Sequence, residues 1–215
     1  MKKELYFCSD NIKAVSENIL KKAKISSIVR PYSFFPEQSA LIVLDMQEYF
    51  LNHNSHAFIP SSSAIIENIN LIVKLFEEKK LPVIYTKHID SESSGMMSKW
   101  WNGNISAEDE MSKISPQIIC SNEKVITKKQ YDAFYNTALE ELLIQKSIKQ
   151  LVITGVATNL CCENTARSAF IRGFEVMFPI DTTATYSFDF HLSSIINLSH
   201  GYSNIMLLEE LSGKF

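Results

Sequence analysis

Short, fully apolar runs alternate along this chain with longer amphipathic segments. Six runs have the length and the β-branched content of strands, at residues 40–44, 82–86, 125–127, 151–154, 176–180 and 205–208. A strand that is apolar on both faces must be buried on both, which is typical of parallel sheets covered by helices. The pattern therefore predicts an α/β fold with three α/β/α layers, a mostly parallel sheet and a Rossmann-like topology.

The segments between these runs have helical periodicity. Serines at 61–63 can cap a helix to about residue 80, and further helices are expected over 133–146, 162–172 and 188–200. The polar stretch 88–122 has no such pattern. Loops of that length are uncommon in compact domains unless they cover a functional site.

No linker or internal repeat divides the 215 residues. Residues 1–39 combine one helical pattern with a segment punctuated by Pro31 and Pro36. We expect them to form an N-terminal extension that packs on a single domain spanning residues 40–215.

The composition excludes several function classes. The net charge of −3 provides no basic surface for nucleic acid or for anionic lipid. No apolar run is long enough to span a bilayer, and the N-terminus lacks the apolar stretch of a signal peptide. The sequence thus predicts a cytoplasmic protein whose partner is a small-molecule substrate.

The four cysteines do not suggest a disulfide framework. They lie at positions 8, 120, 161 and 162, and none forms a C-x-x-C pair of the kind found in zinc or redox sites. Cys161 and Cys162 follow the apolar run 151–154 and a short polar turn, where a helix is expected to begin. The unpaired N–H groups of a helix N-terminus favour a thiolate, so either thiol is a candidate nucleophile.

Chemically reactive side chains stand at the ends of three of the predicted strands. Asp45 follows the first strand, Lys128 the third, and the two cysteines the fourth. Because ligands bind at the carboxyl ends of the strands in open α/β sheets, we expect these groups to meet at one edge. Together they can take up a thiol proton, attack a carbonyl carbon and stabilise developing charge.

Three motifs carry a family resemblance: LIVLDMQEYF at 41–50, VITKKQYDAF at 125–134 and VITGVATNLCCENTARSAF at 152–170. In this order and spacing they resemble the isochorismatase-like cysteine hydrolase superfamily, from about residue 40 to residue 208. The resemblance implies an isochorismatase-like fold and a homo-oligomer, either a dimer or a tetramer.

The resemblance also implies roles for individual residues. Asp45 corresponds to the general base, Lys128 to the second member of the catalytic triad, and Cys161, rather than Cys162, to the nucleophile. It further implies a cis peptide bond between Val156 and Ala157. The backbone N–H groups of Ala157 and Cys161 would then form the oxyanion hole.

Neither a metal nor another cofactor is expected. Nicotinamidase-type members of the superfamily carry an Asp-x-His…His metal cluster after the second strand. The corresponding segment here reads TKHIDSESSG and lacks that pattern.

Six residues are candidates for substrate binding. The aromatic ones are offered as pocket walls, His88 as a contact at the end of the second strand, and Arg167 as a partner for a substrate carboxylate, with a structural ion pair as its alternative role. The six are Phe50, His88, Trp100, Trp101, Tyr131 and Arg167.

The thiol decides which reaction the sequence predicts. Isochorismatases proper hydrolyse a vinyl ether by protonation and have no need of it. The sequence therefore favours a cysteine hydrolase that cleaves a C–N bond of a small amide, carbamoyl or ureido compound through a covalent acyl-thioenzyme. The alternatives are an isochorismatase-type vinyl ether hydrolase and a non-catalytic relative that only binds a small molecule.

Overall fold

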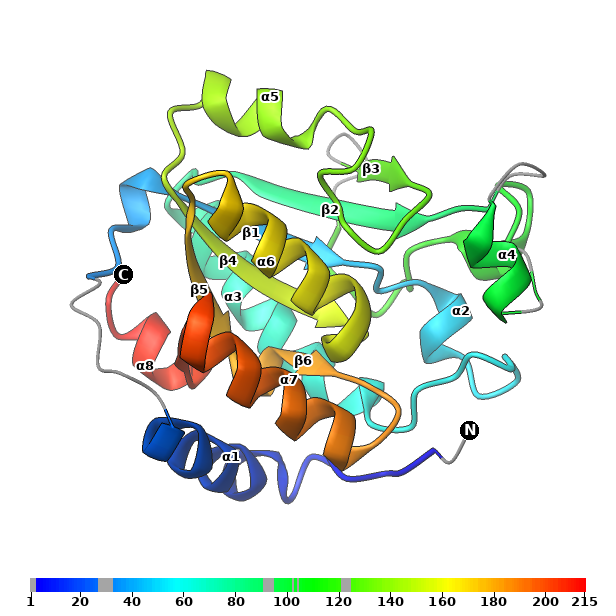
Figure 1. The fold of residues 1–215 in the computed structure, drawn as a ribbon, viewed down its shortest axis with the longest axis horizontal. Helices are drawn as coiled ribbons and strands as arrows, with labels where there is room; N and C mark the ends of the chain where they lie inside the picture. Colours follow the sequence, from blue (N-terminus) through cyan, green and yellow to red (C-terminus); the bar gives the residue numbers. More distant parts are fainter. Residues whose placement is uncertain (1–2, 27–32, 91–94, 102, 104, 121–124) are drawn as a thin grey trace.

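A parallel sheet forms the centre of the molecule (Figure 1). The computed structural model describes residues 3–26, 33–90, 95–101, 103, 105–120 and 125–215. Within these residues seven strands pair in parallel in the order β3-β2-β1-β4-β5-β7, with β6 added to the end of β4. The strands are β1 Ser39–Leu44, β2 Val83–His88, β3 Val125–Lys128, β4 Gln150–Val156, β5 Glu175–Pro179, β6 Thr183–Ala184 and β7 Asn204–Met206.

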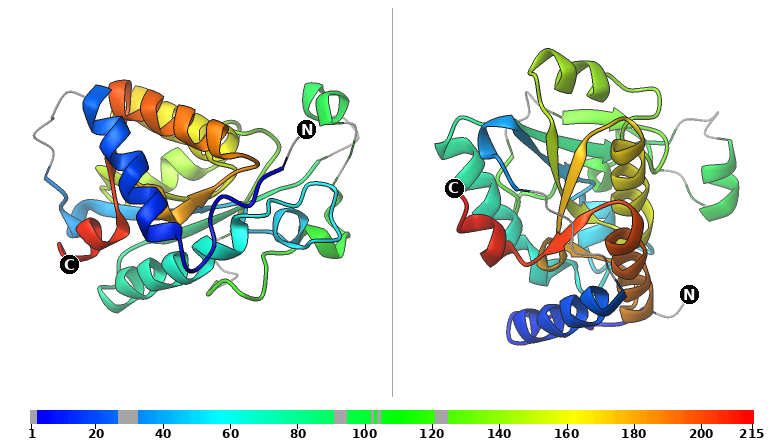
Figure 2. Two further views of the ribbon diagram at one scale, coloured as in Figure 1. Left: turned by 90° about the horizontal axis from the view of Figure 1, so that it is seen from below. Right: turned by 60° about the vertical axis from the view of Figure 1, so that its left-hand side comes forward.

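Helices cover both faces of this sheet, as the left view of Figure 2 shows. Helices α6 and α7 lie on one face, and α3 and α8 lie on the other. The helices are α1 Ile12–Ser26, α2 Glu48–Leu51, α3 Ile66–Glu78, α4 Met96–Trp101, α5 Leu139–Gln145, α6 Glu163–Ile171, α7 Phe188–Gly201 and α8 Leu208–Ser212. No helix in the described ranges combines the length and apolar character needed to cross a bilayer. The predicted three-layer α/β fold is confirmed.

The burial of the strands explains why the fold could be predicted. Every residue of β1 and of β4 is buried, so neither strand has a solvent-facing side. The six predicted strands all occur, with small shifts at their ends.

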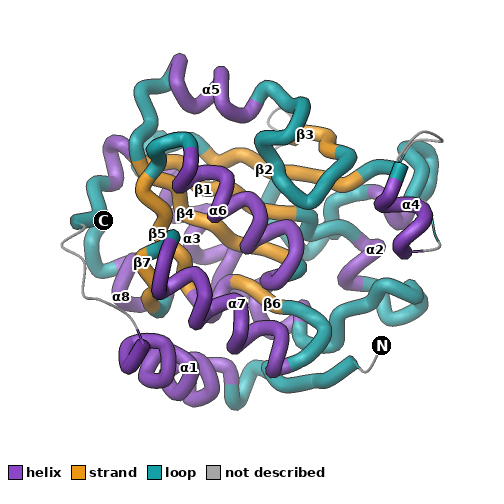
Figure 3. The backbone as a smooth tube through the Cα atoms, viewed as in Figure 1, coloured by secondary structure: helices purple, strands orange, loops and turns teal. Residues whose placement is uncertain are grey.

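Three predicted elements differ from the structure (Figure 3). The helix expected over 133–146 is α5 alone, because residues 129–138 form turns that lead from β3. The strand expected over 205–208 ends at Met206, and α8 begins at Leu208. The polar stretch 88–122 is not all loop, since it contains the short helix α4.

The N-terminal segment lies against the domain. Helix α1 runs beside α7, and the backbone N–H groups of Tyr6 and Phe7 both donate to the hydroxyl of Ser61. The N–H of Thr185 in turn donates to the phenol oxygen of Tyr6. The division into residues 1–39 and 40–215 stays a prediction.

At the carboxyl ends of strands β1 and β4, Leu44 pairs with Gly155. Gly155 has a φ of +110°, and a Cβ built on it would lie 2.1 Å from the carbonyl oxygen of Leu44. Only glycine has the backbone freedom and the small size that this position requires. This requirement explains the glycine of the GV pair in the third sequence motif.

We expect Gly155→Ala to lower the free energy of unfolding by at least about 3 kcal/mol, because the new methyl group clashes with backbone and cannot move away. Gly173→Ala is the matched control. Gly173 also has a positive φ, of +87°, but nothing lies within 4 Å of its added Cβ. Urea denaturation should show a clearly smaller loss for the control, and equal losses would contradict the steric explanation.

A buried histidine fixes α7 against the turn that follows β4. His191 is fully buried, and its Nδ1 lies 2.9 Å from the hydroxyl oxygen of Thr158. The rings of Tyr6 and Phe7 pack beside it. Burial lowers the pKa of His191 to about 3.

Because the pKa of His191 is lowered, the free energy of unfolding decreases as the pH falls. The unfolded chain binds a proton near pH 6.5 that the folded chain refuses until about pH 3, so stability is lost as the pH falls below 6.5. Between pH 7 and pH 5 this residue should contribute a loss of about 2 kcal/mol. Urea denaturation of His191→Gln should show a shallower dependence of the free energy of unfolding on pH than the wild type shows, and an equal dependence in the two proteins would contradict this explanation.

Candidate active site

Asp45 stands at the carboxyl end of β1 and is fully buried. Its backbone has a φ of +51°, a conformation that non-glycine residues seldom adopt and that aspartate tolerates better than most. Thr86, on the neighbouring β2, donates from its hydroxyl to Asp45 Oδ1 at 2.6 Å. The carboxylate is therefore held in one orientation.

Lys128 ends β3 and connects the carboxylate to the thiol. Its Nζ lies 2.7 Å from Asp45 Oδ2 and 3.3 Å from Cys161 Sγ, and it donates to the carbonyl oxygen of Gln130 at 2.9 Å. Burial disfavours the charged ammonium, but Asp45 and the Cys161 sulfur outweigh that effect and raise the Lys128 pKa. The lysine is thus a permanent cation inside the protein.

Cys161 lies in the π-helical turn Thr158–Cys162 between β4 and α6. The pKa of its thiol is raised to about 12, since burial and the Asp45 carboxylate outweigh the attraction of Lys128. This differs from the expectation that a helix N-terminus favours the thiolate. In this structure burial next to a carboxylate is the stronger influence, and it favours the protonated thiol.

Cys162 is buried behind Cys161, and burial raises the pKa of its thiol well above the ordinary value. It packs within the hydrophobic core and does not line the pocket described below. The two adjacent thiols therefore have different surroundings. Of the two, the thiol of Cys161 contacts the Lys128 ammonium.

The turns after β3 are fixed to α6, which brings Lys128 to Cys161. The N–H of Ala133 donates to the hydroxyl of Thr165, and the hydroxyl of Ser168 donates to Asp132. Thr165 and Ser168 belong to the helix that begins directly after the cysteines. These two contacts join the second sequence motif to the third.

Gln47 ties the ends of β1 and β2 together. It is buried, its side-chain amide donates to the carbonyl oxygens of His88 and Ser112, and its Oε1 accepts from the N–H of His88.

The peptide bond between Val156 and Ala157 is cis, as the family resemblance implies.

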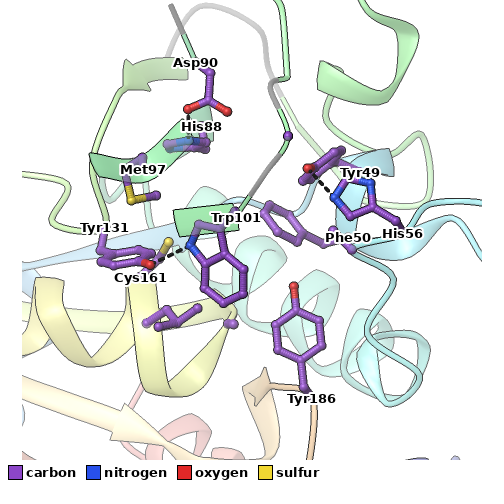
Figure 4. Close-up of a pocket in the computed structure, with 14 residues that line it drawn as sticks. Tyr49, Phe50, His56, His88, Asp90, Met97, Trp101, Tyr131, Cys161 and Tyr186 are labelled. Atoms are coloured by element: carbon purple, nitrogen blue, oxygen red, sulfur yellow. Dashed lines mark hydrogen bonds and ion pairs between the residues drawn. The ribbon is translucent and has the colours of Figure 1, made fainter. Parts of the chain in front are cut away.

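A mainly aromatic pocket of about 90 Å³ opens above Cys161 (Figure 4). Trp101 and Tyr131 form one wall, and the indole Nε1 donates to the phenol oxygen at 2.7 Å. Burial raises the pKa of Tyr131, so it is an uncharged phenol at neutral pH. The lining residues are Tyr49, Phe50, His56, Ala57, His88, Asp90, Met97, Trp101, Gly103, Tyr131, Ala157, Leu160, Cys161 and Tyr186.

Two polar pairs interrupt the aromatic lining. His88 Nε2 lies 3.0 Å from Asp90 Oδ1, and Asp90 Oδ2 also accepts from the backbone N–H of Ile105. The phenol oxygen of Tyr49 lies 3.0 Å from His56 Nε2. Across the described residues no group of three or more His, Cys, Asp or Glu side chains is arranged to hold a metal ion.

Four of the six candidate substrate-binding residues line this pocket: Phe50, His88, Trp101 and Tyr131. Trp100 does not, because the turn of α4 that directs Trp101 inward leaves Trp100 72% exposed. Arg167 does not either. It forms an ion pair with Glu163 at 2.6 Å and lies over the ring of Tyr202, so its alternative role as a structural ion pair is the one observed.

Sequence reasoning missed several residues of the site. Thr86 and Gln47 orient the strand ends, and Tyr49, Asp90 and Tyr186 line the pocket. Gln47 stands within the first sequence motif and was accessible to such reasoning, whereas Thr86 lies in the second predicted strand, outside all three motifs. Tyr186 comes from the connection between β6 and α7, and no local pattern marks it.

Comparison with known proteins places the chain in a family. The isochorismatase domain model matches residues 39–210. The chain belongs to the isochorismatase family.

This isochorismatase-family chain is similar to several named proteins. It is 32% identical to nicotinamidase 3 of Arabidopsis thaliana over 179 residues, which cover 80% of this chain and 86% of that protein. It is 28% identical to enterobactin synthase component B of Escherichia coli K12, covering 84% of this chain and 64% of that one. The crystal structure of a cysteine hydrolase from Pseudomonas syringae superposes with a TM-score of 0.82 at 21% identity, covering 87% and 98% of the two chains.

The raised pKa of Cys161 predicts slow alkylation of this family member in the absence of substrate. At pH 8 the thiol is protonated, so iodoacetamide should modify Cys161 more slowly than it modifies glutathione. The rate should rise by about tenfold per pH unit up to pH 10, as it does below the pKa of any thiol. Peptide mass spectrometry would measure it. A rate that levels off near pH 7 would show a resting thiolate.

Proposed function

We propose that this protein is a cysteine hydrolase that cleaves a C–N bond of a small amide, carbamoyl or ureido compound through a covalent acyl-thioenzyme. The observation that carries the proposal is the contact of the Lys128 ammonium with both the Asp45 carboxylate and the Cys161 sulfur. Of these three residues Cys161 lines a pocket that suits a small, largely apolar molecule.

In the first step the thiol proton moves to Asp45 as Cys161 Sγ attacks the carbonyl carbon. A base is needed because the thiol pKa of about 12 leaves almost no thiolate at neutral pH. Thr86 and Lys128 hold the carboxylate in position for this transfer. The lysine also stabilises negative charge on sulfur while the proton is moving.

The negative charge that develops on the substrate oxygen needs hydrogen-bond donors. In this proposal they are the backbone N–H groups of Ala157 and Cys161. Both residues line the pocket, Ala157 directly before the π-helical turn and Cys161 within it. Donors fixed in advance and shielded from water stabilise such a charge far better than solvent does.

The second half of the reaction returns the enzyme to its starting state. The tetrahedral intermediate expels the amine, which takes the proton held by Asp45, and leaves an acyl group on Cys161. Asp45 then removes a proton from water, the water attacks the thioester, and the thiol is regenerated with release of the acid. Lys128 keeps its proton throughout, consistent with its raised pKa.

Amide cleavage accounts for more of this site than the alternatives. Hydrolysis of a vinyl ether by protonation would give Cys161 no task, although the thiol contacts the lysine. A non-catalytic binding protein would give the buried Asp45–Lys128 pair no task either. The similar Arabidopsis protein is named as a nicotinamidase, and nicotinamide is an amide.

The test is a hydrolysis assay over a panel of small amides, ureido acids and isochorismate. Cys161→Ala should lower kcat/KM for the best substrate by at least about 1,000-fold, because the nucleophile is lost. Cys162→Ala removes the neighbouring thiol and should retain activity. Mass spectrometry of the quenched wild-type reaction should show an acyl group on Cys161.

Retained turnover of an amide by Cys161→Ala would refute the covalent mechanism. Hydrolysis of isochorismate by that variant, without any amide hydrolysis by the wild type, would assign the protein to the vinyl ether hydrolases instead.

A further inference from the structure

The charge of the pocket bears on the class of amide that this site accepts, an inference that rests on the proposed function. Among the described residues that line the pocket there is no lysine or arginine. One lining residue, Asp90, is a carboxylate. An anionic group entering this space would lose its hydration without gaining a permanent cation as partner.

None of the three described cations Lys128, Arg167 and Lys3 lines the pocket. Lys128 pairs with Asp45 and does not line the pocket. Arg167, which the sequence offered as a partner for a substrate carboxylate, is paired with Glu163. The ammonium of Lys3 donates to the carbonyl oxygen of His56 and lies 5.5 Å from the centre of the Tyr186 ring, and Lys3 is likewise not a lining residue.

Asp90 is held rigidly within the pocket wall. Its side chain is only 7% exposed, one carboxylate oxygen lies 3.0 Å from His88 Nε2, and the other accepts from the N–H of Ile105. In Figure 4 Asp90 and His88 lie together on the side of β2, away from the thiol of Cys161. The carboxylate therefore lies toward the end of the pocket away from the thiol.

We infer that Asp90 is a specificity-determining residue that selects amides whose distal end is uncharged or cationic and rejects those that carry a carboxylate there. Like charges brought together in a poorly solvated space repel strongly, whereas a hydroxyl or ammonium group can donate to the aspartate. The aromatic walls formed by Phe50, Trp101 and Tyr131 fit a planar body between the two ends.

Three benzamides with different meta substituents test this selection: hydroxymethyl, aminomethyl and carboxylate. Binding is measured by calorimetry on the Cys161→Ala variant, which holds each compound without turnover, and kcat/KM is measured on the wild type by ammonia release. The carboxylate compound should bind at least about 100-fold more weakly than the hydroxymethyl compound, as expected for juxtaposed like charges.

Asp90→Asn keeps the shape of the side chain and removes its charge. Introduced into the Cys161→Ala background, it should reduce the discrimination between the aminomethyl and carboxylate compounds by at least about tenfold. The matched control is Asp10→Asn, which removes a charge from an exposed side chain that does not line the pocket, and it should leave the discrimination unchanged.

Equal binding of the carboxylate and hydroxymethyl compounds would overturn the inference, and so would an absence of binding by all three. Unchanged discrimination in a folded Asp90→Asn variant would refute the role of Asp90. These outcomes are separable from failure of the proposed function. If charge selection is observed but the wild type hydrolyses no amide, the proposed reaction fails and the selection stands.

Discussion

The buried ion pair between Asp45 and Lys128 is the constraint on which the site depends. The two residues end strands that are separated by β2, and Thr86 on that middle strand completes the connection. A charge this deeply buried is very costly unless its partner is present, so neither residue can be lost alone without severe destabilisation. The pair also sets the state of Cys161, because the carboxylate and the ammonium shift its thiol pKa in opposite directions.

The parallel sheet brings these groups together without the need for long loops. In a parallel sheet every strand ends at the same edge, so side chains from distant parts of the sequence meet there. Gly155 lets β4 approach β1 closely just before the turn that carries Cys161. Gly155 therefore contributes both to the packing of β4 against β1 and to the position of Cys161.

The arrangement of the parallel sheet explains which parts of the structure could be predicted from the sequence. The strands were predictable because β1 and β4 are buried on both faces. The meeting of Asp45, Lys128 and the two adjacent cysteines was predictable because they follow strands, but the choice of Cys161 over Cys162 came from the family resemblance. The sequence could not tell Trp100 from Trp101, since the orientation of α4 depends on tertiary contacts such as that with Tyr131. The charge of the pocket was equally hidden, because it depends on how residues from separate loops converge.

The two adjacent tryptophans have a consequence for how the protein can be studied. They are the only two in the chain, and they differ sharply in surroundings. Trp101 is hydrogen-bonded in the pocket wall, whereas Trp100 is turned toward solvent. Iodide in solution can quench the fluorescence of Trp100 while Trp101 remains shielded, so the residual emission is an intrinsic optical reporter of whether the cavity is occupied.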